Sequence, residues 1–264
     1  AKAFEWYSRA ATNMNLWGVK CVARCYQSGT GVKKSTRLAI EYYKMAAQKN
    51  DPEAKLKLGC LYLEENSATQ HSEGVALITS AAKQGLASAQ YALSKLYFYG
   101  RGVPKDLSKM LYWLKKAGDN QSLIALYDLG LKYESGCGTD KSLSKAIEYY
   151  HRVLSEKESK KSTDSRSDVR YYQSAAHYRL HNILISESAD KEKVKKFAKA
   201  ADHLIKSAEL NYTDAEYMLG FLYHHGSTPD EPFGISQDFE KAIYWYTRAA
   251  DKGDKQALFR LGIM

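Results

Sequence analysis

The amino-acid sequence predicts an all-α protein with an α/α solenoid fold, a right-handed superhelix of stacked antiparallel helix pairs. Three observations predict this fold: a motif recurs with a period near 36 residues, each copy holds two amphipathic stripes, and glycines lie between the stripes. A single helix pair cannot bury its apolar stripe, so each pair needs its neighbours to form a continuous core.

The stretch Ala89–Asn120 is the cleanest copy of the motif. An amphipathic first helix is predicted by the helical spacing of Ala89, Leu93, Leu96 and Tyr97. Gly100 and Gly102 predict the end of that helix, because glycine readily takes the positive φ values that a helix end needs. A second apolar stripe over 107–117 then predicts the second helix of the pair.

The central leucine of the motif sets the register of the other copies. Its position is occupied by Val22, Leu58, Leu93, Leu129, Leu180, Leu219 and Leu261. This register predicts one continuous solenoid over 1–264, with repeat units at about 16–51, 52–85, 86–120, 121–170, 171–212 and 213–254. Half-units lie at 1–15 and 255–264, so we expect the chain to be a fragment of a longer protein.

Two copies and two insertions depart from the pattern. The second copy has Glu64–Ser72 in place of the glycine turn, and the fifth has His181 where other copies have a small residue. The insertion 155–170 has hardly any apolar residue, which predicts a mobile loop. In the insertion 227–237, we expect Phe233 and Ile235 to fold back on the solenoid; the alternative is a contact with a partner.

The recurring small residues and tyrosines predict how the helices pack. Columns of alanine and glycine allow neighbouring helices to approach closely, so leucine in place of Gly59 or Gly220 should overpack the contact, at a cost of about 1–3 kcal/mol. Tyrosines at one repeat position are expected to be half-buried, with the hydroxyl bonded to a partner or to water. They are Tyr26, Tyr62, Tyr97, Tyr133 and Tyr223.

The full pattern, A-x-x-x-L-G-x-x-Y-x-x-G-x-G-V followed by K-A-x-x-W/Y-Y-x-x-A-A-x-x-G, resembles the Sel1-like repeat, a relative of the tetratricopeptide repeat. One copy supplies Ala215, Leu219, Gly220, Tyr223, Lys241, Ala242, Tyr246, Ala249, Ala250 and Gly253. The resemblance covers essentially the whole chain and implies a non-catalytic scaffold or adaptor that binds another protein along its concave surface. The alternative is a regulatory module that positions a catalytic domain or an enzyme partner. Members of the family include adaptors of degradation complexes, activators of chitin synthase and bacterial factors that act on host cells.

Charge and composition bound the kind of partner. The chain carries a net charge of +9 and is 44% hydrophobic. Dispersed lysines are most simply a solvated helical surface, and the alternative is a surface for an acidic protein or an extended peptide or helix. No nucleic-acid-binding signature is present, so we expect no nucleic-acid partner, and no apolar run is long enough for a membrane span.

The cysteines predict a reducing compartment. Cys21, Cys25, Cys60 and Cys137 do not recur at the repeat spacing, so they form no disulfide framework. This favours a cytoplasmic location.

The sequence contains no recognisable catalytic arrangement, and we predict that the chain is not an enzyme and has no cofactor. His177 and His181 lie one helical turn apart, a spacing that could present two imidazoles to one metal ion. No H-E-x-x-H motif and no third ligand accompany them, so we predict no metal site.

The candidate binding residues lie on the first helices, opposite the apolar stripe. The predicted set is Lys57, Tyr91, Lys95, Tyr99, Tyr127, Asp128, Arg179, Tyr217, Met218 and Phe221. Aromatic residues flanked by lysines suit an extended peptide or a partner helix, and the residue after the aromatic one varies as if it were free of packing. Packing between adjacent first helices explains the aromatic residues equally well.

Overall fold

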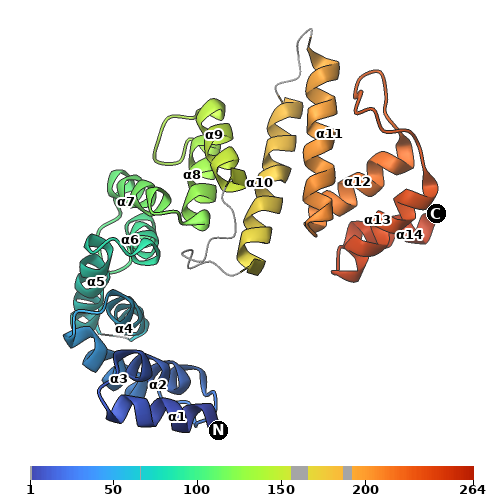
Figure 1. Ribbon diagram of the computed structural model, residues 1–264. Helices are drawn as coiled ribbons and strands as arrows, with labels where there is room; N and C mark the ends of the chain where they lie inside the picture. The colour runs from blue at the N-terminus through green and yellow to red at the C-terminus, as the bar shows by residue number, and fades with distance from the viewer. Residues whose placement is uncertain (1, 66, 156–165, 187–191) are drawn as a thin grey trace. The chain divides into compact units, whose positions relative to one another are not determined.

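The computed structural model of the chain describes residues 2–65, 67–155, 166–186 and 192–264 (Figure 1). Within these ranges it contains fourteen α-helices and no strand, which confirms the predicted all-α fold. The helices are α1 Lys2–Thr12, α2 Leu16–Ser28, α3 Thr36–Gln48, α4 Pro52–Glu64, α5 Ala68–Lys83, α6 Ala87–Tyr99, α7 Leu107–Asp119, α8 Leu123–Ser135, α9 Leu143–Ser155, α10 Arg166–Ser186, α11 Lys193–Glu209, α12 Thr213–His225, α13 Phe239–Asp251 and α14 Lys255–Ile263.

The chain forms two compact units, residues 1–125 and 126–264. In both units the even-numbered helices are the first helices of the repeat, and the odd-numbered helices are the second helices. Within the first unit from α1 to α7, and within the second from α9 to α14, the helices pack chiefly on the helices before and after them in the sequence, as in a stack of helix pairs. None of the described helices combines the length and the apolar character that a bilayer crossing requires.

Glycine ends the first helices as predicted. Gly29 closes α2 with φ 78° and Gly100 closes α6 with φ 71°, and each lies in the left-handed region. The backbone N–H of Gly100 donates to the carbonyl of Leu96 over 2.9 Å, which satisfies one of the last carbonyls of the helix. The starts are capped as well: Asp51 Oδ1 accepts the N–H of Ala54 at 2.7 Å.

The ends of the second helices give an exact structural register. A residue with positive φ follows each of six second helices, and four of these residues are not glycine: Met14, Asn50, Gln121 and Asn211, beside Gly85 and Gly253. The residue seven positions before each of them lies in a second helix and is large. These residues are Tyr7, Tyr43, Ile78, Leu114, Leu204 and Tyr246. We call this position the large column, and the position before it the ring column.

The large column forms the core contact of most pairs. Tyr43, Tyr150 and Tyr246 are buried. A Cβ on Gly220 would come within 2.7 Å of Cδ1 of Tyr246, and one on Gly59 within 2.7 Å of the Gly74 carbonyl oxygen. The predicted close approach at these glycines is confirmed.

The first-helix tyrosines are less uniform than predicted. Tyr62 and Tyr133 are buried at 5% and 4% exposure, whereas Tyr26, Tyr97 and Tyr223 are half-buried as expected.

The insertions differ in outcome. Phe233 and Ile235 are buried, and Phe233 packs edge-on against Phe197 at 4.7 Å, so the predicted folding back is confirmed. The loop predicted over 155–170 is wrong at both ends, because α9 extends to Ser155 and α10 begins at Arg166, with Val169 buried. The rest of that prediction, over 156–165, lies outside the described residues.

Candidate partner-binding surfaces

Four of the predicted binding residues lie in the first unit, on α4 and α6. Lys57 is exposed, and Tyr99 has 69% of its surface exposed. Tyr91 and Lys95 are half-buried, with Lys95 Nζ 5.2 Å from the centre of the Tyr91 ring. A cation over an aromatic face holds both side chains together at the surface.

Lys57 also borders a small polar cavity between α2 and α4. The cavity has a volume of about 170 Å³, and Trp17, Arg24 and Glu53 lie around it with Lys57. Lys20 on its wall is paired with Asp51 at 3.1 Å and Glu53 at 2.7 Å, so its charge is satisfied within the fold.

Tyr127 and Arg179, in the second unit, belong to a packed network that joins α8, α9 and α10. The Tyr127 ring lies 5.8 Å from the Tyr150 ring, and Arg179 Nη1 lies 3.6 Å from Glu134 Oε1. The Tyr150 hydroxyl donates to Glu134 Oε2 at 2.6 Å, and burial together with this bond raises the pKa of Tyr150. Arg179 therefore has a role inside the fold, and Asp128, which follows Tyr127 in the sequence, is half-buried.

The three predicted residues on α12 are also engaged in packing. Tyr217 lies 5.8 Å from the Tyr246 ring, and Met218 packs on the apolar cluster between α11 and α12. Phe221 packs on the same cluster and has the Arg260 guanidinium 5.5 Å above its ring. The variable position after the aromatic residue is thus not uniformly free of packing: Met218 and Cys21, which is 4% exposed, contribute to cores, whereas Lys57 is exposed.

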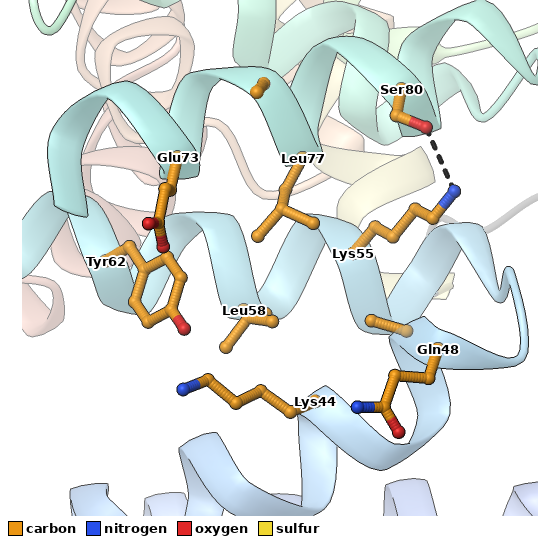
Figure 2. Close-up of a pocket in the computed structure, with 10 residues that line it drawn as sticks. Lys44, Gln48, Lys55, Leu58, Tyr62, Glu73, Leu77 and Ser80 are labelled. Carbon is orange, nitrogen blue, oxygen red and sulfur yellow. Dashed lines mark hydrogen bonds between the residues drawn. The ribbon is translucent and has the colours of Figure 1, made fainter. Parts of the chain in front are cut away.

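A larger groove, which the sequence analysis did not identify, lies in the first unit between α3 and α5, with α4 beneath (Figure 2). Its volume is about 510 Å³. Leu58 and Leu77 lie in the middle of the view, Tyr62 and Glu73 at one end, and Lys55 at the other. The groove thus has an apolar floor and charged ends.

Two lysines on this groove, Lys44 and Lys55, make their closest polar contacts to neutral groups among the described residues. Lys55 Nζ donates to Ser80 Oγ at 2.9 Å and to the side chain of Asn50, both neutral groups. Lys44 Nζ lies 5.7 Å from the centre of the Tyr62 ring, and its interaction with the Tyr62 side chain raises the pKa of Lys44. Within the described ranges, neither lysine has a carboxylate oxygen at ion-pair distance, whereas Lys20 has two.

The histidines singled out in the sequence are not paired with each other. His177 Nδ1 lies 2.8 Å from Nδ1 of His203 on α11, and buried His181 bonds the Ala200 carbonyl at 2.8 Å. Burial lowers the pKa of both His177 and His203 to about 4, with a further contribution from neighbouring charge. In the part of the chain that the structure describes, no group of three His, Cys, Asp or Glu side chains is placed to hold a metal ion.

The repeat register contained the signal for the groove. The ring column reads Trp6, Tyr42, Leu77, Trp113, Tyr149, His203 and Trp245, so Leu77 is the one member without a ring. This departure of Leu77 from the other second helices is visible in the sequence and marks the pair α4–α5.

Comparison with known proteins agrees with this architecture. The family model described as "Sel1 repeat" matches residues 1–13, 14–51, 52–86, 87–122, 123–152 and 213–254. A crystal structure of a Sel1 repeat protein from Oxalobacter formigenes superposes with a TM-score of 0.74 at 23% identity, covering 98% of this chain and 68% of that one. This likeness shows the fold.

Two curated relatives align along almost the whole chain. Chitin synthase regulator SKT5 of Saccharomyces cerevisiae is 26% identical over 98% of this chain and 36% of its own length. Chitin synthase regulatory factor 3 of Schizosaccharomyces pombe is 27% identical over 98% of this chain and 26% of its own length. The chain therefore spans about a third or less of these relatives.

Proposed function

Because the chain belongs to the Sel1 repeat family, we propose that it is a non-catalytic protein-binding scaffold that brings a regulator to an enzyme partner of the chitin synthase class. The observation that carries this proposal is the alignment of 98% of the chain with two proteins that are named for regulating chitin synthase. Both names describe an action on another protein, which suits a solenoid built to present extended surfaces.

The polar clusters of the second unit support a scaffold role. Glu216 is fully buried and paired with Arg248 at 2.9 Å and Lys252 at 2.6 Å, which joins α12 to α13. His177 and His203 join α10 to α11 through a contact of 2.8 Å between their Nδ1 atoms. These side chains hold helix pairs together, and that leaves the surface residues for recognition.

A segment exchange tests the proposal. The matching segment of SKT5 in Saccharomyces cerevisiae is replaced by residues 1–264 of this chain, and cell-wall chitin and co-precipitation of chitin synthase are measured. We expect both to exceed the values for a strain in which the segment is deleted. A matched exchange carrying Gly220→Leu, which overpacks α12 against α13, should fall to the deletion value. Equal chitin and equal recovery for the exchange and the deletion, at equal protein levels, would contradict the proposal.

We also propose that the four predicted residues on α4 and α6, Lys57, Tyr91, Lys95 and Tyr99, form one contact surface for the partner. The exposure of Lys57 and Tyr99 and the cation–aromatic pair of Tyr91 and Lys95 on α6 support this choice. Lys57→Glu with Lys95→Glu should reduce recovery of the partner, while the α12 residues act through stability. The control is Lys105→Glu, an exposed charge reversal elsewhere in the unit. Equal loss in the control would show a general charge effect and contradict a specific surface.

The proposed compartment is reducing and cytoplasmic. All four cysteines are unpaired in the structure, and Cys21 and Cys25 are buried. Alkylation of the unfolded protein after rapid lysis should label four thiols per chain. Recovery of a disulfide between any two of them would contradict this part of the proposal.

A further inference from the structure

The groove between α3 and α5 arises from a missing aromatic ring. In two other pairs, the ring-column residue stacks on the tyrosine of its own first helix: Tyr42 on Tyr26 at 5.8 Å, and Tyr149 on Tyr133 at 5.5 Å. In the pair α4–α5 the corresponding residues are Tyr62 and Leu77, and both line the groove. The smaller Leu77 side chain leaves open the space that a ring takes elsewhere.

The neighbouring position widens the same opening. The residue before Leu77 is Ala76, whereas the corresponding residues of the other second helices are all larger: Glu5, Glu41, Tyr112, Glu148, Asp202 and Tyr244. Ala76 also lines a second cavity of about 600 Å³, which shares Ser80 with the first and extends to Lys83. The two cavities therefore form one groove along α5, with a ring-sized apolar site in it.

The charges along the groove favour acidic residues on either side of an aromatic ring that a partner places in it. Three lysines line it, Lys44, Lys55 and Lys83, against one acidic residue, Glu73. Lys55 is bonded to neutral partners, and Lys44 lies beside a ring, so both ammonium groups can accept a carboxylate without breaking an ion pair. A carboxylate beside a lysine gains affinity and association rate through charge complementarity.

We propose that this groove binds a partner segment that places one aromatic side chain, tryptophan or tyrosine, over Leu58 and Leu77, with Asp or Glu residues beside it. The ring supplies the buried apolar area and the carboxylates supply orientation, which is the usual division between an anchor and its rim. The inference rests on the proposed function, because it specifies what the partner must carry.

A second copy of the chain fits the groove poorly. Each copy carries a net charge of +9, so two copies repel one another where the groove itself is basic. An acidic partner has the opposite charge, and its attraction weakens as salt screens it.

The first test is binding of a short labelled peptide to the full chain by fluorescence polarisation. The probe has the sequence Gly-Asp-Glu-Trp-Asp-Glu-Gly with fluorescein at its amino end. We expect saturable binding that weakens with salt. A peptide with alanine for tryptophan should bind at least about tenfold more weakly. A peptide with lysine for each acidic residue should not bind. No saturable binding by the first peptide, or equal binding by all three, would overturn the inference.

The second test fills the groove from the protein side. Leu77→Trp restores the ring that other pairs carry, so it should keep the fold, checked by circular dichroism, and weaken the tryptophan peptide at least about tenfold. Tyr149→Trp is the matched control, because it changes a ring-column residue that already has a ring. If Leu77→Trp disturbs folding, Lys44→Glu with Lys55→Glu replaces it and should weaken binding equally. Full affinity in a folded groove variant would overturn the inference.

The same variants separate this inference from the proposed function. If the segment exchange restores chitin and the Leu77→Trp exchange restores it equally, the scaffold proposal holds and the groove inference fails. A second outcome is that the exchange does not restore chitin and chitin synthase does not co-precipitate, yet the peptide binds as described. In that case the groove inference holds and the proposed enzyme partner is wrong. A shift to dimers that depends on Leu77 in sedimentation would identify a second copy as the occupant and overturn the acidic partner.

Discussion

The helix pairs α4–α5 and α12–α13 carry the same repeat, yet they are held together differently. In α4–α5, Gly59 lies against the backbone of Gly74 and the side chain of Ile78. In α12–α13, Gly220 lies against the Tyr246 ring. The aliphatic pair brings two backbones into contact, whereas the aromatic pair places a ring between them.

The polar residues of the two pairs differ at one shared position, the residue after the first alanine of the first helix. It is Lys55 in α4, bonded to neutral Ser80, and Glu216 in α12, paired with two cations. The pair that lacks a ring in the ring column thus also keeps Lys55 free of carboxylates. The comparison indicates that one helix pair can lose part of its side-chain packing and gain an accessible groove, while another pair of the same repeat keeps a closely packed core.

The largest difference in stability between the two pairs is expected when the polar side chain at this shared position, Glu216 or Lys55, is removed. Glu216→Ala leaves Arg248 and Lys252 without their buried carboxylate and should lower the free energy of unfolding by about 2–4 kcal/mol. Lys55→Ala removes a half-buried side chain with neutral partners and should cost about 1 kcal/mol or less. Urea unfolding of both variants measures the difference, and equal costs would contradict the contrast between the pairs.

Substitution of Gly59 and of Gly220 by alanine should also destabilise the two pairs to different extents. Alanine at position 59 meets a backbone carbonyl oxygen at 2.7 Å, which cannot move alone, so Gly59→Ala should destabilise by about 1–3 kcal/mol. Gly220→Ala meets a ring at 2.7 Å that can rotate away, so its cost should be smaller. Thermal unfolding midpoints compare the two. A larger loss at 220 would show that the ring is the more rigid neighbour.

An exchange within the ring column sharpens the comparison. Trp245→Leu gives α13 the residue of α5 and removes part of a half-buried ring, so it should cost about 1–2 kcal/mol. Leu77→Trp gives α5 the residue of α13 and should change stability by less than about 1 kcal/mol, because the space is open. The two variants are compared by urea unfolding. A large loss with Leu77→Trp would mean that the groove cannot accommodate a ring.

In the pair α10–α11 the residue after the first-helix alanine is His177, which contacts His203. This pair should destabilise the fold at acidic pH and not near neutral pH. His177 and His203 have a pKa lowered to about 4 from the usual 6.5, so the unfolded chain binds more protons between these values. Stability should therefore be complete above pH 6.5 and fall as the pH drops toward 4. His151 and Lys206 lie near the pair and oppose its protonation, while Asp202 favours it at His203.

The unfolding midpoint at pH 7.5 and at pH 5 measures this response. The double variant His177→Gln with His203→Gln should lose less stability between the two pH values than the wild-type chain does. An unchanged pH response would show that other groups cause it.

Much of this fold could be predicted from the sequence because the repeat is short and regular. The leucine register and the glycines predicted where helices such as α6 and α7 begin and end, and the apolar character of Phe233 predicted its burial. Contacts between separate helices were harder to predict. His203 lies 26 residues after His177, and nothing in the spacing marks it as the partner. Arg179 is on the predicted face, but its pairing with Glu134 depends on how α8 and α10 pack.

The central claim is that a missing ring makes α4–α5 a binding site while α12–α13 stays closed. Methyl resonances of the isotope-labelled chain, followed during addition of the tryptophan peptide, test it directly. The account predicts that Leu58, Leu77 and Ala76 shift progressively to saturation, while Leu219 and Leu222 on α12 do not move. Shifts confined to α12, or equal shifts in both pairs, would contradict it.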